Sequence, residues 1–291
     1  MINKTAILIN VKDRPTELAL ALQSLRTQTF QEFDIFVLDD CSGTPLQSYH
    51  FLNCLTAMLK LEDHHIFFKR TEFTHGVSRA RQAIVDWCLE TYDYEYLCRL
   101  DDDCIFKSNY LEKLFEVINK GYDLASGVTI PCGPVLKRNT KYISNQIVNR
   151  VILDDEGNYI MNGDDCGMPY VDEKILPAHH FRSCALYKSS IHTKHDIKYY
   201  PTRLSMHGFR EEQFLSYKIL MAGLKIGVNT GAINYHQMTP SGGERPTQNM
   251  TQFNQDALIE YTKNNKDKLK KLFPNEPMPT ELELLKETNL K

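Results

Sequence analysis

An apolar run that ends in three consecutive aspartates, Tyr96 to Asp103, constrains the fold of this chain more than any other stretch. The run is long enough for one buried strand and too short for a helix. Three carboxylates at a strand end repel one another unless a cation neutralises them or each accepts hydrogen bonds. Hard divalent cations such as Mg²⁺ or Mn²⁺ take oxygen ligands and usually share them with a phosphate. The run therefore predicts either a metal and phosphate site or an acidic turn before the helical segment that starts at Tyr110.

A second acidic strand end precedes this one in the chain. Thr5 to Val11 and Asp34 to Leu38 are rich in apolar and β-branched residues, which predicts two buried strands. The segment between them, Thr16 to about Gln28, has a helical pattern, so the unit reads as two parallel strands with a right-handed crossover. Ligands of open α/β sheets bind at the carboxyl ends of strands, so we expect Asn10 and Asp40 to lie near the three aspartates.

A glycine turn and two arginines open the next predicted helix, after a third strand at about His65 to Lys69. Gly76 permits a tight turn, and Ser78 can cap the helix. Free backbone N–H groups and a guanidinium at a helix N-terminus make a ready anion site. We assign Arg81 to that site and interpret Arg79 as a solvated surface residue.

Two adjacent glutamates, Glu211 and Glu212, stand in the first turn of a helix predicted between Met206 and Gly223. Gly223 suits the position just after the last helical turn. Acids in a first turn complement the helix dipole, which alone would explain the pair. The functional interpretation is a general base at the mouth of a pocket.

Two short strands, Lys225 to Val228 and Ala232 to His236, are predicted next, followed by a glycine-containing loop that carries Arg245. At a strand end, His236 is a candidate third metal ligand beside the aspartates, or else a hydrogen-bonded core histidine. The loop around Arg245 could close on a phosphate and then release it.

Three stretches have weaker patterns. From Pro131 to about Pro177 the chain predicts loops and hairpins that form a pocket wall or a mobile lid. His179 and His180 would point to opposite faces of a strand, which favours a structural or substrate-contact role over metal ligation. Beyond Thr251, an amphipathic helix to about Leu272 and a proline-broken charged tail predict a packed appendage or an oligomer contact.

Composition excludes several function classes. Hydrophobic residues are 42% and charged residues 24% of 291, as in an ordinary globular protein, and the formal net charge of −3 gives no general attraction to nucleic acid. The 8 cysteines are scattered without a C-x-x-C pair, which predicts a reducing, cytoplasmic compartment and no zinc site. We expect no signal peptide and no transmembrane segment.

In their order, these motifs resemble the inverting nucleotide-sugar glycosyltransferases of family two. The matching stretches are I-L-I-N-V-K-D-R-P, L-R-T-Q-T-F-Q-E-F-D-I-F-V-L-D-D-C-S, G-V-S-R-A-R-Q-A, L-D-D-D, G-F-R-E-E-Q-F-L with A-G-L-K-I, and Y-H. The resemblance covers roughly residues 4 to 240 and implies the α/β GT-A fold, a mixed, mainly parallel sheet flanked by helices, with a C-terminal helical appendage. It implies a transferase domain at 1–240, with a nucleotide-binding half at about 1–105 and an acceptor-binding half at about 106–240, before a flexible loop and helical tail at 241–291.

Carried over residue by residue, the resemblance implies that Asn10 and Asp40 border the nucleotide base, with Asp40 accepting from a ring N–H. Arg81 matches the arginine of the family's A-R-N segment, near the base or the diphosphate, although Gln82 replaces the usual asparagine. Family habit favours UDP over GDP or dTDP, and Arg245 belongs to a loop that would contact the diphosphate.

The acids follow the same resemblance. Asp101 and Asp103 match the outer acids of the D-x-D motif, and Asp102, grouped with the nucleotide-binding residues, departs from its usual small or apolar middle residue. Asp103 is implied to bind Mn²⁺ or Mg²⁺ that bridges the diphosphate, with Asp101 at the ribose or a metal-bound water. Glu211 and Glu212 take the place of the family's E-D pair, which makes Glu212 the implied base. It would deprotonate a hydroxyl of a glycan, glycolipid or polysaccharide precursor in a single displacement that inverts the sugar.

Three other functions fit parts of the pattern. A phosphatase or phosphotransferase would place a nucleophilic aspartate after the first strand, where this chain has Asn10. A sugar nucleotidyltransferase would need a glycine-rich loop in place of Lys12 to Pro15. A non-catalytic protein that binds sugar nucleotides or glycans on the same fold stays an alternative, since fold alone does not establish activity. A lipid-linked acceptor would imply peripheral contact with a membrane, and the C-terminal tail a contact within a homo-oligomer.

Overall fold

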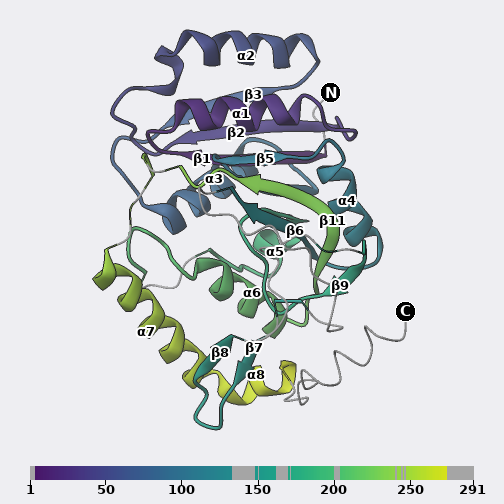
Figure 1. Cartoon of the computed structure of the whole chain (residues 1–291), viewed down its shortest axis with the longest axis vertical. Coiled ribbons are helices and arrows are strands. Elements are labelled where there is room, and N and C mark those ends of the chain that lie inside the picture. The colour runs from purple at the N-terminus through teal and green to yellow at the C-terminus, as the bar shows by residue number, and fades with distance from the viewer. Residues whose placement is uncertain are drawn as a thin grey trace.

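One large sheet forms the centre of the computed structural model, which describes residues 4–132, 148–149, 151–161, 170, 172–199, 204–239, 241–243, 245 and 247–273 (Figure 1). The strands lie in the order β3 (Ile66–Arg70), β2 (Phe33–Asp39), β1 (Thr5–Val11), β4 (Tyr96–Asp101), β10 (Ala185–Lys188), β6 (Leu124–Pro131), β11 (Ile226–His236) and β5 (Cys104–Phe106), with β9 (Ile175–Pro177) beside β11. The long pairings, β3-β2-β1-β4 and β6-β11, are parallel, whereas β10, β5 and β9 pair antiparallel with their neighbours. This confirms the predicted α/β class with a mixed, mainly parallel sheet.

The parallel register brings three strand ends to one edge of the sheet. Asn10 of β1 pairs with Asp101 of β4, and Val11 pairs with Asp39 of β2. Residues that follow β2 and β4 therefore lie on either side of the end of β1.

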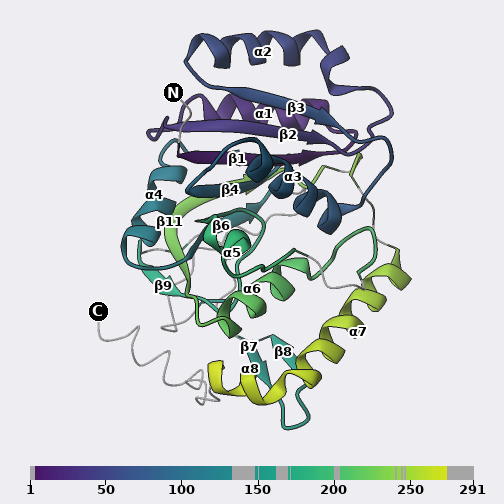
Figure 2. The same ribbon diagram turned by 180° about the vertical axis from the view of Figure 1, so that it is seen from behind.

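Helices cover both faces of the sheet, and the alternation of side chains along β1 separates the two cores. Ile7 and Ile9 pack with buried residues of three helices: α1 (Pro15–Leu25), α2 (His50–Leu61) and α4 (Tyr110–Asn119). Ala6 and Leu8 face the other side, toward α3 (Val77–Thr91), α5 (Ser190–Thr193) and α6 (Glu211–Met221). Figure 2 shows this second face from behind.

A smaller third core joins the C-terminal helices to α6. It contains residues of the β7–β8 hairpin (Val151–Leu153 and Tyr159–Met161), α6, α7 (Gln248–Asn264) and α8 (Lys266–Leu272). The two last helices lie at the end of the molecule opposite α2 (Figures 1 and 2). No helix among the described residues has both the length and the apolar character needed to cross a bilayer. The tail from residue 274, which we predicted as a packed appendage or an oligomer contact, lies outside the described residues. So does more than half of the irregular segment 131–177.

The start of α3 differs from our prediction. Gly76, with a φ of 78°, holds the N-cap position, and Ser78 lies buried inside the helix instead of capping it. Two N–H groups at this end have partners from other segments, since Gly76 donates to Asp40 Oδ2 and Val77 donates to the Met206 carbonyl. A Cβ at Gly76 would lie 2.7 Å from the Met206 backbone, so both the φ angle and the close approach require glycine.

Four other elements also differ. The two strands predicted at 225–228 and 232–236 are one strand, β11, whose register against β6 shifts between Val228 and Ile233. Within this bulge, Asn229 is buried and donates to the Lys113 carbonyl. The single C-terminal helix is two, broken at Asn265. The histidine pair 179–180 lies before β10 and not on a strand, and α2 was not predicted.

Candidate active site

A cavity of about 540 Å³ opens at the carboxyl ends of β1, β2 and β4. All the site residues that the sequence predicted line it, together: Asn10, Asp40, Arg81, Asp101, Asp102, Asp103, Glu211, Glu212, His236 and Arg245. They come from segments far apart in the chain, and the sheet register together with the packing of α3 and α6 on one face brings them to one place.

Asp40 and Asn10 fix the entrance to α3. Asp40 is 4% exposed, and its Oδ1 and Oδ2 accept from the backbone N–H groups of His75 and Gly76 at 2.9 and 3.1 Å. Asn10 Nδ2 donates to the Ala80 carbonyl at 2.9 Å. Both residues therefore shape this side of the cavity by holding a neighbouring segment, besides lining it.

We call Arg14, Asp102, Asp103 and His236 the outer cluster. Nη1 of Arg14 lies 2.8 Å from Oδ2 of Asp103 and 3.1 Å from Oδ1 of Asp102. The other oxygen of Asp103 lies 3.2 Å from Nε2 of His236. Burial lowers the pKa of His236, but the hydrogen bond and charge of Asp103 outweigh it, so the pKa is raised. Burial above all raises the pKa of Asp102 to about 7, with Arg14 opposing and Asp103 reinforcing the shift.

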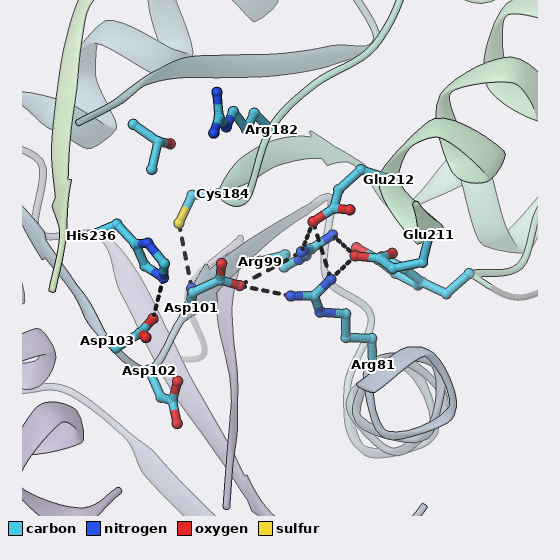
Figure 3. Close-up of polar contacts among 12 residues, drawn as sticks. Arg81, Arg99, Asp101, Asp102, Asp103, Arg182, Cys184, Glu211, Glu212 and His236 are labelled. Atoms are coloured by element: carbon cyan, nitrogen blue, oxygen red, sulfur yellow. Dashed lines mark hydrogen bonds and ion pairs between the residues drawn. The ribbon is translucent and has the colours of Figure 1, made fainter. Parts of the chain in front are cut away.

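We call Arg81, Arg99, Asp101, Glu211 and Glu212 the inner cluster (Figure 3). Arg99 contacts Glu211 at 2.9 Å, Glu212 at 3.0 Å and Asp101 at 3.6 Å. Arg81 reaches the same three acids, with 2.9 Å to Asp101, 3.5 Å to Glu212 and a direct contact with Glu211. Two guanidinium groups thus neutralise most of the charge of three carboxylates in a closely packed set.

The two glutamates of the inner cluster differ in their exposure. The Glu211 side chain is 1% exposed and enclosed between the arginines, whereas the Glu212 side chain is 23% exposed. Burial raises the pKa of Glu212, but the charges of Arg99 and Arg81 together lower it by more, so the pKa is lowered overall. Glu212 is therefore an ionised carboxylate that meets both the arginines and the cavity.

Among the members of the two clusters, Arg99 and Arg14 are the residues that sequence reasoning missed. Arg99 is 2% exposed within β4, and its guanidinium lies over the rings of Phe181 and Tyr199 at 5.4 and 5.6 Å. An arginine inside an apolar strand was a usable signal, because a buried charge needs partners. Arg14, in the loop after β1, carried no comparable signal.

Two groups of the outer cluster, Asp103 and His236, offer ligand types that divalent cations accept. Adjacent ligands of an octahedral Mg²⁺ ion at 2.0–2.1 Å lie about 3 Å apart, and the Asp103 and His236 ligand atoms are separated by 3.2 Å. Carboxylate oxygens and an imidazole also suit Mn²⁺. Asp101 lies near the thiols of Cys104 and Cys184 as well. The hydrogen bond with Cys184 and burial raise the pKa of Cys104 well above its usual value, which disfavours a thiolate ligand.

Arg245 occupies the outer rim of the cavity. It is exposed, and Nη2 donates to the Thr239 carbonyl at 2.7 Å. The sequence-predicted contact with a diphosphate would come from this rim.

Comparisons with known proteins agree with this geometry. The family model described as "Glycosyl transferase family 2" matches residues 6–211. The structure of S. aureus TarS 1–349 in complex with UDP-GlcNAc aligns with a TM-score of 0.55 and 14% identity over 89% of this chain and 66% of that one. GalNAc-T7 with UDP, GalNAc and Mn²⁺ aligns with a TM-score of 0.64 and 14% identity over 99% of this chain and 55% of that one.

Unliganded TarS 1–349 aligns with a TM-score of 0.54 and 15% identity over 80% of this chain and 60% of that one. This chain thus spans less than two thirds of the length of these solved structures. At such identities the alignments show a shared GT-A fold. A comparison with curated protein sequences gives no match.

Proposed function

The chain belongs to glycosyl transferase family 2, and we propose that it is an inverting enzyme that moves a sugar from a UDP-sugar to an acceptor hydroxyl. The acceptor would be a glycan or a lipid-linked saccharide. One observation carries the proposal: the strand-end acids Asp101 to Asp103 and the partly exposed, ionised Glu212 line the same cavity. Diphosphate binding and proton removal can then act on one bound sugar.

The donor is proposed from two sources. Asn10 and Asp40 lie on the side of the cavity nearest β1 and β2, where an open α/β sheet binds nucleotides. The aligned structures of TarS and GalNAc-T7 contain UDP-GlcNAc and UDP, respectively. Asp103, with Asp101 and His236, would hold a Mn²⁺ or Mg²⁺ ion, which supplies charge neutralisation for the departing diphosphate.

Glu212 performs the proton transfer in this proposal. Its carboxylate accepts the proton of the acceptor hydroxyl while that oxygen forms a bond to the anomeric carbon. The bond from the anomeric carbon to the diphosphate breaks on the opposite side, and the nucleoside diphosphate leaves with the electron pair. A single displacement of this kind inverts the configuration of the sugar.

Glu211 does not reach the acceptor in this scheme. Its enclosed carboxylate balances Arg81 and Arg99, which in turn hold Glu212 ionised and oriented. In this scheme Glu211 has a structural role and Glu212 a catalytic one, although the two are adjacent in the sequence.

A paired thermal-shift and turnover experiment tests the proposal. UDP-, GDP-, dTDP- and CMP-sugars are screened with and without Mn²⁺. With the best ligand, the nucleotide that leaves as the sugar passes to acceptor or water is then measured. A ligand at a hundredfold excess over its Kd stabilises by about 2.7 kcal/mol, a clear melting shift. Glu212→Gln should keep the shift and lose at least about 10²-fold in turnover.

Glu211→Gln is the matched control, with the same chemical change one residue away. If it abolishes turnover while Glu212→Gln remains active, the base is assigned wrongly. A Mn²⁺-dependent shift with no turnover in the wild type would favour the non-catalytic binding protein.

A further inference from the structure

Arg14 joins the loop after β1 to the acidic end of β4. Its contacts with Asp102 and Asp103, at 3.1 and 2.8 Å, are made by one nitrogen, Nη1, and its side chain is 14% exposed. The same side chain lines the cavity beside Lys12. Arg14 thus places a positive charge on the carboxylate that, under the proposed function, receives a divalent cation.

A guanidinium and a divalent cation compete for Asp103. One oxygen of this carboxylate accepts from Arg14, and the other lies 3.2 Å from His236. An ion that takes Asp103 weakens the pairing with Arg14, and a partly buried guanidinium without an anionic partner is unfavourable. A diphosphate in the cavity is a suitable replacement, because the planar fork of arginine binds phosphate oxygens by parallel charge-assisted hydrogen bonds.

Neighbouring backbone keeps the guanidinium at the edge of the cavity. Nε of Arg14 donates to the Ser241 carbonyl at 3.3 Å. A Cβ at Gly242 would lie 2.6 Å from Cγ of Arg14, and one at Gly243 would lie 3.0 Å from Nη2. The side chain is therefore packed along its length, and a change of partner requires only a turn of its end.

We propose that Arg14 exchanges between the aspartates and the donor diphosphate. In the free protein it neutralises Asp102 and Asp103, and it binds a phosphate oxygen once a cation occupies Asp103. This inference rests on the proposed function, since it requires a nucleoside diphosphate ligand. The exchange opposes cation binding in the absence of donor and strengthens donor binding in its presence, so that cation and diphosphate enter together.

Binding measurements on Arg14→Gln test the exchange. Mn²⁺ binding to the protein alone is measured by electron paramagnetic resonance, and UDP and uridine binding by calorimetry at saturating Mn²⁺. We expect Arg14→Gln to bind Mn²⁺ about tenfold more tightly and UDP about tenfold more weakly, with uridine unchanged, as for the loss of one charge-assisted hydrogen bond. Arg70→Gln, which removes an arginine that pairs with Asp39 at 3.7 Å outside the cavity, should change none of these values.

Arg14→Lys separates charge from shape. It should keep the weak Mn²⁺ binding of the wild type and still bind UDP more weakly, because an ammonium lacks the fork. Equal Mn²⁺ affinity in wild type and Arg14→Gln would overturn the exchange, and so would a loss of uridine binding equal to the loss of UDP binding. If the wild type binds no nucleoside diphosphate with Mn²⁺, the proposed function fails and the role of Arg14 fails with it.

Discussion

The outer and inner clusters solve the same electrostatic problem in different ways. The inner cluster sets two arginines against three acids, and Arg99 at its centre is 2% exposed and lies over two aromatic rings. The outer cluster sets Arg14 and a histidine against Asp102 and Asp103 at the cavity wall. The first is part of the core, whereas the second, under the proposed exchange, has partners that a cation and a phosphate replace.

This difference matters for a site that must bind and release a charged ligand. Groups that orient a base gain from fixed positions, because a rigid contact needs no reorganisation during the reaction. Groups that receive a diphosphate must lose their own contacts first, so pairs made by a single nitrogen, like those of Arg14 with Asp102 and Asp103, suit them. The three consecutive aspartates join the two kinds of cluster, with Asp101 in the inner one and Asp102 and Asp103 in the outer one.

The largest expected difference between the clusters is in stability. Arg99→Met leaves Glu211, Glu212 and Asp101 with one arginine, which should cost about 4 kcal/mol of unfolding free energy, as for a broken buried ion pair. Urea unfolding with an unchanged m-value measures it. Arg14→Gln is the matched variant in the outer cluster and should cost clearly less, because Asp102, whose pKa burial raises to about 7, can take up a proton once the guanidinium is gone. Equal losses would remove the distinction between a fixed and an exchangeable cluster.

The aromatic support of the inner cluster should be sensitive to acid. His192 stacks on Tyr199 at 5.8 Å between ring centroids, and burial lowers its pKa to about 4, with Asp86 opposing and Lys198 adding to the shift. The folded state disfavours protonation of His192. The contribution of neutral His192 to the free energy of unfolding is therefore complete above its unfolded pKa of about 6.5 and is lost as the pH falls toward 4.

Between pH 7 and pH 4, protonation of His192 should lower the free energy of unfolding by about 3 kcal/mol. His192→Gln cannot titrate and should flatten this part of the pH dependence of urea unfolding. If the unfolding free energy of the variant still falls as steeply with pH, residues other than His192 cause the acid sensitivity.

The smallest effect on stability is expected at Asp103, the proposed metal ligand. Asp103→Asn loses its charge pairing with Arg14 but also relieves repulsion from Asp102, so the free energy of unfolding should change by less than about 1 kcal/mol. The Mn²⁺-dependent thermal shift with UDP should nevertheless disappear. A loss above 2 kcal/mol would show that the outer cluster is also structural, and a retained shift would place the metal elsewhere.

Much of this site could be predicted from local sequence. Strand-end acids, a glycine turn before α3 and an acidic first turn in α6 each indicated a residue that lines the cavity, and the order of the motifs indicated the family. Periodicity was weaker where tertiary contacts override it, as in β11, whose polar bulge is buried against α4 by Asn229. Ser78 failed as a cap because Asp40 and Met206 supply the partners from other segments.

By itself, the sequence determined the strand-helix alternation, the acids at the strand ends and the choice of two candidate glutamates, because hydrophobic periodicity and turn chemistry act over a few residues. Only the tertiary structure decided which acid meets which arginine. Asp101 and Asp103 are two residues apart, yet one faces Arg81 and Arg99 and the other Arg14 and His236. Those partners come from the loop after β1, from β11, from α3 and from β4 itself. The strength of each ion pair depends on burial, which no local pattern contains.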